Sequence, residues 1–168
     1  MKKLIILVIA VIGIMDAKAQ IDFPPTPEAM LIGKHTFDEL KGSTDYTWFD
    51  KGVVSYPPTP AFIDSLKKFK KPYTLYILGG TWCDDTQKLL PQLYVVLKTI
   101  NKKIDTEVTL YFVDRDKKSP DGTEATYELK NVPTIIVYNK ANVEVGRIIE
   151  SVKISVEADL LQILKKIK

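Results

Sequence analysis

The clearest hydrophobic pattern in the chain lies between residues 73 and 97. Apolar, β-branched and aromatic residues fill the run Tyr73-Thr-Leu-Tyr-Ile-Leu78, which Pro72 and Gly79 bound, so we expect a buried strand here. After it, apolar residues recur at helical spacing, at Leu89, Leu90, Leu93, Val96 and Leu97. A strand therefore turns into a helix across residues 79–91.

The same reasoning predicts most of the remaining elements. Apolar periodicity predicts helices over 60–70, over 121–130 and from about Val156 onward, and a strand over 108–113. Two further strands, 134–138 and 143–149, flank Asn139-Lys-Ala-Asn142 and should form an antiparallel hairpin. Residues 46–56 alternate around Asp50-Lys51-Gly52, which predicts one strand or a second hairpin. This order of strands and helices indicates an α/β domain.

Residues 20–58 give the weakest signals and are interpreted as an N-terminal extension. Phe23-Pro-Pro-Thr-Pro27 and Tyr56-Pro-Pro-Thr-Pro60 form a small repeat, and each Thr-Pro is followed by apolar residues. Threonine suits the cap of a helix and proline its first position, so both segments are typical helix starts. Two similar caps that arose by chance explain the repeat more simply than a shared function.

The first residues have the pattern of a targeting segment. Lys2 and Lys3 precede an apolar run from Leu4 to Met15, and Ala17-Lys18-Ala19 supplies a small-x-small cleavage site. We interpret residues 1–19 as a signal peptide cleaved after Ala19 and expect export to the periplasm or beyond the cell, without stable membrane insertion. The alternative is an uncleaved anchor, although the run is short for a membrane span.

Composition and charge narrow the function classes. The 168 residues are 45% hydrophobic, enough for one domain with its own core. Without residues 1–19, which hold three lysines and one aspartate, the formal charge falls from +3 to +1. A near-neutral protein has no electrostatic reason to bind nucleic acid.

The single cysteine of the chain, Cys83, lies where the strand becomes the helix. Free N–H groups and the positive dipole end of a helix N-terminus stabilise a thiolate. An exported chain with one cysteine cannot form an internal disulfide, so we expect a reactive thiol or an intermolecular partner. The alternative is a cysteine buried as a small hydrophobic residue.

Two motifs resemble the thioredoxin superfamily. Trp82-Cys83-x-x-Thr86, with Pro91 eight residues after the cysteine, resembles the active-site helix that reads Trp-Cys-x-x-Cys in thioredoxins. Asn131-Val132-Pro133-Thr134 resembles the Val/Ile-Pro-Thr segment whose proline is cis and faces the cysteine. The resemblance covers residues 59–168 and implies a thioredoxin-like α/β fold, with a central mixed sheet flanked by helices.

The resemblance also implies roles for these residues. Cys83 is the nucleophile, and Trp82, Val132 and Pro133 form the substrate groove. Thr86 stands where thioredoxins have a second cysteine, and its hydroxyl can donate a hydrogen bond to the Cys83 thiolate. Because Thr86 cannot attack a mixed disulfide, an external thiol must resolve it. Sulfenic acid is the other fate of Cys83.

Three acidic residues are candidate modulators. The charges of Asp84 and Asp85 oppose a thiolate, although these residues more simply stabilise the helix N-terminus. Glu150 falls near the position of a groove glycine of thioredoxins, where it either faces Cys83 or ends a strand in solvent. Ile77 replaces a buried aspartate that thioredoxins use for proton transfer.

The sequence therefore predicts thiol–disulfide exchange through mixed disulfides of Cys83 with client proteins or small thiols. The competing hypothesis is a redox-inactive thioredoxin-fold adaptor that binds a peptide or protein over the same groove. Peroxidase chemistry ranks third, because threonine follows the cysteine instead of preceding it. No cofactor or metal site is expected. His35 is the single histidine, and a surface role is simpler for it than a Cys–His pair or a metal site.

Overall fold

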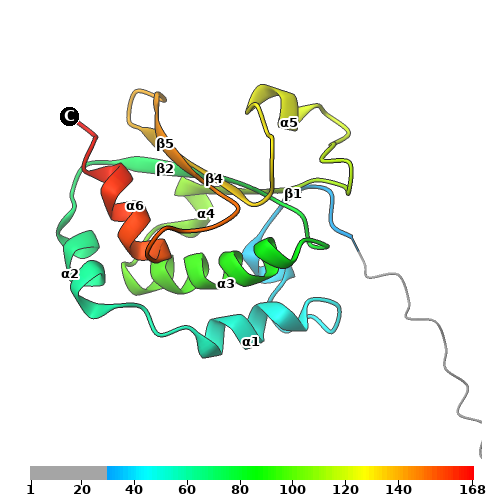
Figure 1. The fold of residues 1–168 in the computed structure, drawn as a ribbon, viewed down its shortest axis with the longest axis horizontal. Helices are drawn as coiled ribbons and strands as arrows, with labels where there is room; N and C mark the ends of the chain where they lie inside the picture. The colour runs from blue at the N-terminus through cyan, green and yellow to red at the C-terminus, as the bar shows by residue number, and fades with distance from the viewer. Residues whose placement is uncertain (1–29) are drawn as a thin grey trace, which may run out of the picture.

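A computed structural model describes residues 30–168, and a five-stranded mixed sheet forms its centre in the order β1-β3-β2-β4-β5 (Figure 1). The proposed signal peptide and the Thr26-Pro27 helix start lie outside the described residues. Strand β2 (Tyr73–Gly79) is parallel to β3 (Val108–Phe112) and antiparallel to β4 (Thr134–Asn139). The edge strands β1 (Gly33–His35) and β5 (Glu144–Ile149) are antiparallel to β3 and β4.

The helices lie unequally on the two sides of this sheet (Figure 1). On one side lie α1 (Thr47–Ser55), α2 (Pro60–Lys68), α3 (Asp84–Thr99) and α6 (Val156–Leu164). On the other side lies α5 (Thr123–Thr126), while the short α4 (Ile104–Glu107) precedes β3 and the 3-10 turn η1 (Phe37–Glu39) follows β1. The two faces of the sheet are therefore covered to very different degrees.

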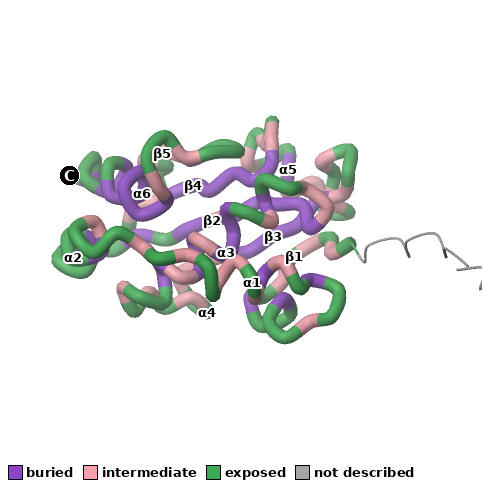
Figure 2. Tube along the Cα trace, turned by 60° about the horizontal axis from the view of Figure 1, so that its bottom comes forward, coloured by how far each residue is buried: buried purple, intermediate pink, exposed green. Residues whose placement is uncertain are grey.

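The main core follows from the alternation of side chains along the strands. Tyr73, Leu75 and Ile77 of β2 are buried and belong to one cluster with the inner faces of α3 and α6. Figure 2 shows the buried positions concentrated in the sheet and the inward sides of the helices. Residues 30–58 contribute to the same cluster, since Phe37 and Phe49 both contact the Tyr94 ring of α3.

The expected strand or hairpin at residues 46–56 is wrong, because this segment is helix α1. On a helix, Phe49, Val53 and Tyr56 fall at spacings of four and three and face the core. Gly52 is not a turn residue but a point of close helix contact. A Cβ atom at Gly52 would lie 2.4 Å from Cγ of Pro91 in α3.

Most other expected elements are confirmed, with one shortened helix. The strand at 73–79, the helix after Cys83, the hairpin of β4 and β5 and the final helix are all present. The helix expected over 121–130 is reduced to Thr123–Thr126. Gly122 and Glu128 both adopt positive φ angles, 69° and 50°, which end helical geometry on either side.

Candidate functional site

Cys83 lies at the point where strand β2 has ended and helix α3 begins. It is the N-cap residue of α3, with extended backbone angles, and its side chain is half-buried. Its N–H donates to the Gly80 carbonyl (3.0 Å), and its own carbonyl accepts from Gln87 N–H (2.9 Å). The turn therefore places Cys83 at the N-terminus of α3, although its sulfur makes no capping hydrogen bond to the first helical turn.

Two glycines allow this turn to be tight. A Cβ atom at Gly79 would lie 2.9 Å from the Thr86 methyl group, and one at Gly80 would lie 2.6 Å from the Trp82 indole. The indole lies across the turn and its Nε1 donates to the Val113 carbonyl (3.0 Å). Packing thus requires the pair Gly79-Gly80, and its place one residue before Trp82-Cys83 was the sequence signal that could have indicated this tight turn.

The second motif lies directly against the sulfur. The Val132–Pro133 peptide bond is cis, and both residues are buried. The Cys83 Sγ donates to the Val132 carbonyl at 3.4 Å. The structure therefore brings together the two motifs that lie 49 residues apart in sequence.

Thr86 is fully buried in the first turn of α3. Its Oγ1 accepts a hydrogen bond from Gly80 N–H (3.2 Å). This bond joins the first turn of α3 to the turn that precedes Cys83. The predicted hydrogen bond from Thr86 to a Cys83 thiolate stays a prediction, because the bond that the structure records connects Thr86 to Gly80.

The candidate modulators occupy exposed positions. Asp84 and Asp85 are exposed in the first turn of α3, where acidic side chains stabilise a helix N-terminus. Glu150 is also exposed. Its backbone contacts the site, since its N–H donates to the Pro133 carbonyl (2.7 Å). Glu150 has a φ of 60°, a left-handed conformation that favours glycine.

His35 belongs to another part of the fold. Its Nδ1 lies 2.7 Å from the Glu39 carboxylate and its Nε2 lies 3.2 Å from the Ile32 carbonyl. Both partners hold the ring at the edge strand β1, so His35 serves the local structure and not the cysteine.

Arg115 is a residue of the site that the sequence did not indicate. Its guanidinium carbon lies 5.5 Å from the centre of the Trp82 ring, within the range of a cation–π contact. The loop that carries it is fixed by Asp114, whose Oδ1 accepts from the N–H groups of Asp116 (2.9 Å) and Lys118 (2.8 Å). A positive charge is therefore held beside the residue that precedes Cys83.

One backbone donor next to the sulfur is unused. Within residues 30–168, the N–H of Val132 makes no hydrogen bond. This donor lies beside the sulfur, because the carbonyl of the same residue accepts from Cys83 Sγ at 3.4 Å.

The described part of the chain holds neither a metal-ligand cluster nor a helix suited to cross a membrane. Residues 30–168 hold no group of three or more His, Cys, Asp or Glu side chains suited to a metal ion. None of the helices in that range combines the length and the apolar composition needed to span a bilayer.

Comparison with known proteins decides the family. A thioredoxin family model matches residues 51–159, a range that contains both Cys83 and Pro133. The chain belongs to this thioredoxin family. A comparison with curated proteins finds no match.

Several solved structures are similar to this chain to different degrees. A protein of unknown function from Pseudomonas aeruginosa is 17% identical, with a TM-score of 0.54 over 81% of this chain and 92% of that chain. An HIV epitope-scaffold is also 17% identical, with a TM-score of 0.52 over 80% and 84%. A Fasciola hepatica thioredoxin is 20% identical, with a TM-score of 0.41 over 62% and 89%.

Proposed function

We propose that this thioredoxin-family protein takes part in thiol–disulfide exchange through Cys83 as its single reactive thiol. The observation that carries the proposal is the contact of the half-buried Cys83 sulfur with Val132, whose N–H is unused. A client chain that pairs with Val132 is placed beside the sulfur. The thioredoxin family and fold support a thiol role in general terms.

The proposed reaction has two balanced steps. The Cys83 thiolate attacks a client disulfide, so that a new S–S bond forms to Cys83 and the second client sulfur leaves as a thiolate, which takes a proton from water. The thiolate of an external protein or small thiol then attacks the client sulfur of the mixed disulfide, so that an S–S bond forms between client and external thiol while the S–S bond to Cys83 breaks and releases the Cys83 thiolate. The net change is a two-electron exchange between client and external thiol. Thr86 has no sulfur and is fully buried, so it cannot perform the second step.

A reaction with oxidised glutathione tests the proposal. Intact-mass spectrometry should find one glutathione adduct on the wild-type chain and none on Cys83→Ser. A matched control places an ordinary exposed thiol elsewhere, by Ser55→Cys in the Cys83→Ser background. Because the helix N-terminus stabilises a thiolate, we expect Cys83 to form its adduct faster than this control. Equal or slower reaction of Cys83 would refute an activated thiol.

The Thr86→Cys substitution provides a second test. A thiol at this position can attack the mixed disulfide from within the chain. The glutathione adduct should therefore be replaced by an internal disulfide in this variant. Persistence of the adduct would show that position 86 cannot reach the Cys83 sulfur and would count against the proposed geometry.

A redox-inactive adaptor is the second candidate, and the unused N–H of Val132 favours it. A client strand that accepts a hydrogen bond from this N–H needs no sulfur chemistry. If the protein is an adaptor, the wild type and the Cys83→Ser variant should bind the same partners. If it acts by thiol–disulfide exchange, its mixed disulfides should be absent from the Cys83→Ser variant and should be lost in reductant.

Export is proposed from the N-terminal sequence pattern. N-terminal sequencing of the protein expressed with its full leader should give Gln20 as the first residue. An intact N-terminus in the membrane fraction would instead support the uncleaved anchor.

A further inference from the structure

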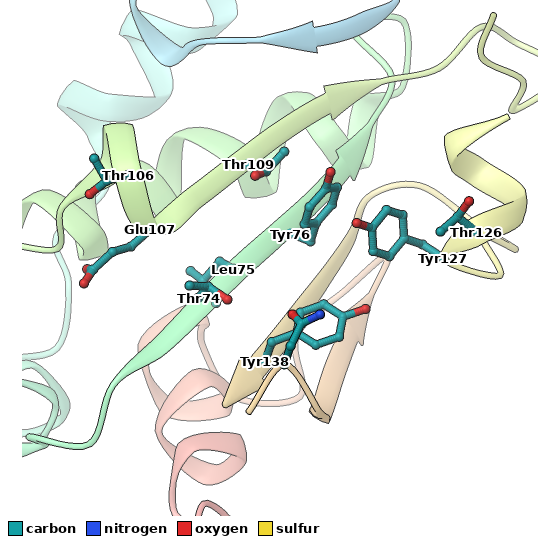
Figure 3. A pocket seen from close by; sticks show the side chains of 10 residues that line it. Thr74, Leu75, Tyr76, Thr106, Glu107, Thr109, Thr126, Tyr127 and Tyr138 are labelled. Carbon is teal, nitrogen blue, oxygen red and sulfur yellow. The ribbon is translucent and has the colours of Figure 1, made fainter. Parts of the chain in front are cut away.

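The less covered face of the sheet holds a cleft that the cysteine site does not use (Figure 3). The cleft has a volume of about 410 Å³ and is lined by residues of β2, β3, β4, α4 and the end of α5. Its β2 residues, 74–76, lie near the start of the strand, whereas Cys83 follows the other end. The cleft and the sulfur are therefore separate sites.

The cleft exists because α5 covers this face of the sheet incompletely. Side chains that alternate with the main core point to this face, and Leu78 and Ile136 among them are fully buried. Farther from these residues, α5 no longer covers the sheet. Thr74 is exposed, and Tyr76 and Tyr138 are half-buried. Polar and aromatic side chains are left open where a longer helix would have covered them.

The hydroxyl groups of the cleft are available to a ligand. Within residues 30–168, the side-chain hydroxyls of Thr74, Thr109 and Tyr138 make no hydrogen bond to another protein group. Each hydroxyl can both donate and accept. Three groups from three neighbouring strands therefore offer donors and acceptors on one surface.

The charges that line the cleft disfavour the binding of an anion and provide little attraction for a cation. Among the described residues that line it, none is lysine or arginine. Its acidic member, Glu107, is paired with Lys102 at 2.9 Å, and this hydrogen bond holds the pKa of Glu107 below its usual range. The carboxylate is thus ionised but balanced, and it can still accept a hydrogen bond from a ligand hydroxyl.

The arrangement of the tyrosine rings also excludes an aromatic cage for a cation. The Tyr76 and Tyr127 rings are stacked, with centroids 4.1 Å apart and planes at 28°, which leaves no space between them. Tyr138 meets Tyr127 edge-on at 6.4 Å. Figure 3 shows the three rings gathered beside the threonines of β2 and β3. Such aromatic surfaces beside free hydroxyls fit the C–H faces and hydroxyls of a sugar.

We propose that this cleft binds an uncharged saccharide of one or two sugar units. The hydroxyls of Thr74, Thr109 and Tyr138 and the Glu107 carboxylate form hydrogen bonds with the sugar hydroxyls, and tyrosine rings contact its apolar face. The cleft volume lies in the range of pockets for small ligands, about 300–1,000 Å³.

Nuclear magnetic resonance with defined sugars tests this proposal. Maltose, cellobiose and N,N′-diacetylchitobiose are titrated into the labelled protein, and at least one should shift the signals of Tyr76 and Tyr138. Thr74→Ala and Tyr138→Phe should each weaken binding about threefold or more, the effect of one lost hydrogen bond. Thr99→Ala removes an exposed threonine of α3 and should change nothing, as should Cys83→Ser.

Other outcomes would overturn the proposal. Absence of shifts with all three sugars, or equal affinity in Thr74→Ala, Tyr138→Phe and wild type, would exclude a saccharide site in this cleft. Inorganic phosphate or tetramethylammonium that shifts the same signals at lower concentration than the sugars would assign the cleft to an ion. Because Cys83 does not line the cleft, failure here leaves the thiol proposal intact.

Discussion

Replacing Gly52 by alanine should force helices α1 and α3 apart. The new Cβ atom would lie 2.4 Å from Cγ and 2.8 Å from Cβ of Pro91. Carbon atoms do not approach so closely, and the pyrrolidine ring of Pro91 has no alternative rotamer that clears the space. Helix α1 must therefore shift, and the fully buried Phe49 one turn earlier must shift with it.

Two opposing effects decide the sign of the change in the free energy of unfolding. Alanine stabilises a helix interior relative to glycine by about 0.5–1 kcal/mol. Overpacking of a well-filled interface costs about 1–3 kcal/mol. Because the obstacle is a rigid ring on a second helix, we expect the cost to lie in the upper part of its range, with a net loss of about 1–2 kcal/mol. For a chain of this size the melting temperature should fall by about 2–8 °C.

Urea unfolding followed by circular dichroism measures this loss. Val54→Ala is the matched control, because Val54 lies in the same helix and is 88% exposed. That control should stay within about 0.5 kcal/mol of wild type. If Gly52→Ala is as stable as wild type or more stable, α1 does not pack on Pro91, and the helical assignment of residues 46–56 loses its main support.

Two further predictions concern hydrogen bonds. Burial alone would raise the pKa of Glu157, but the Tyr56 hydroxyl (2.6 Å) and the Thr59 amide (2.9 Å) outweigh it and hold this pKa below its usual range. The ionised form thus gives stability that is full above the unfolded pKa of about 4.3 and is lost as the pH falls through the lower folded value. Glu157→Gln should lower the free energy of unfolding by about 1–3 kcal/mol at neutral pH. Urea unfolding at a series of pH values should also show a smaller loss of stability toward acid pH than in the wild type. An equal loss of stability in both proteins would contradict this prediction. Gly80→Ala should displace the Trp82 indole and break its hydrogen bond to the Val113 carbonyl. In a Trp48→Phe background, we expect this displacement to shift the tryptophan fluorescence spectrum. An unchanged spectrum would count against the packing of the turn.

The elements that the sequence predicts well are those with clear ends and one dominant period. Strand β2 is bounded by Pro72 and Gly79, and α3 carries an apolar stripe from Leu89 to Leu97. The β4–β5 hairpin has two runs around a short polar segment. In each case local propensity and tertiary burial agree, so the pattern along the chain is sufficient.

The strand or hairpin predicted for residues 46–56 is wrong because their apolar positions fit both the strand period and the helix period. Trp48 and Phe49 followed by Val53 and Tyr56 can be interpreted as two short alternating runs or as one helical face. Gly52 favoured the interpretation as a turn, since glycine is unfavourable inside a helix. Its actual reason is the Pro91 ring on another helix, 39 residues away, and no local pattern contains that information.

The site shows the same limit at the level of side chains. Helical spacing correctly placed Thr86 one turn after Cys83, but spacing does not determine where a hydroxyl points. The direction is set by the turn before the helix, which presents the Gly80 amide to Thr86. Arg115 was missed for a related reason, because its place beside Trp82 depends on a loop fixed by Asp114.

Strand β2 physically separates the two proposed activities. Its inward residues, Tyr73, Leu75 and Ile77, fix α3 and so the position of Cys83, while Thr74 and Tyr76 face the cleft. Because successive side chains of a strand point to opposite faces, an outward substitution leaves the packing of α3 unchanged. Thr74→Ala should therefore affect sugar binding without changing the reactivity of Cys83. Ile77→Ala should do the reverse, since the cavity it opens lies beneath the cysteine helix and on the far side of the sheet from the cleft.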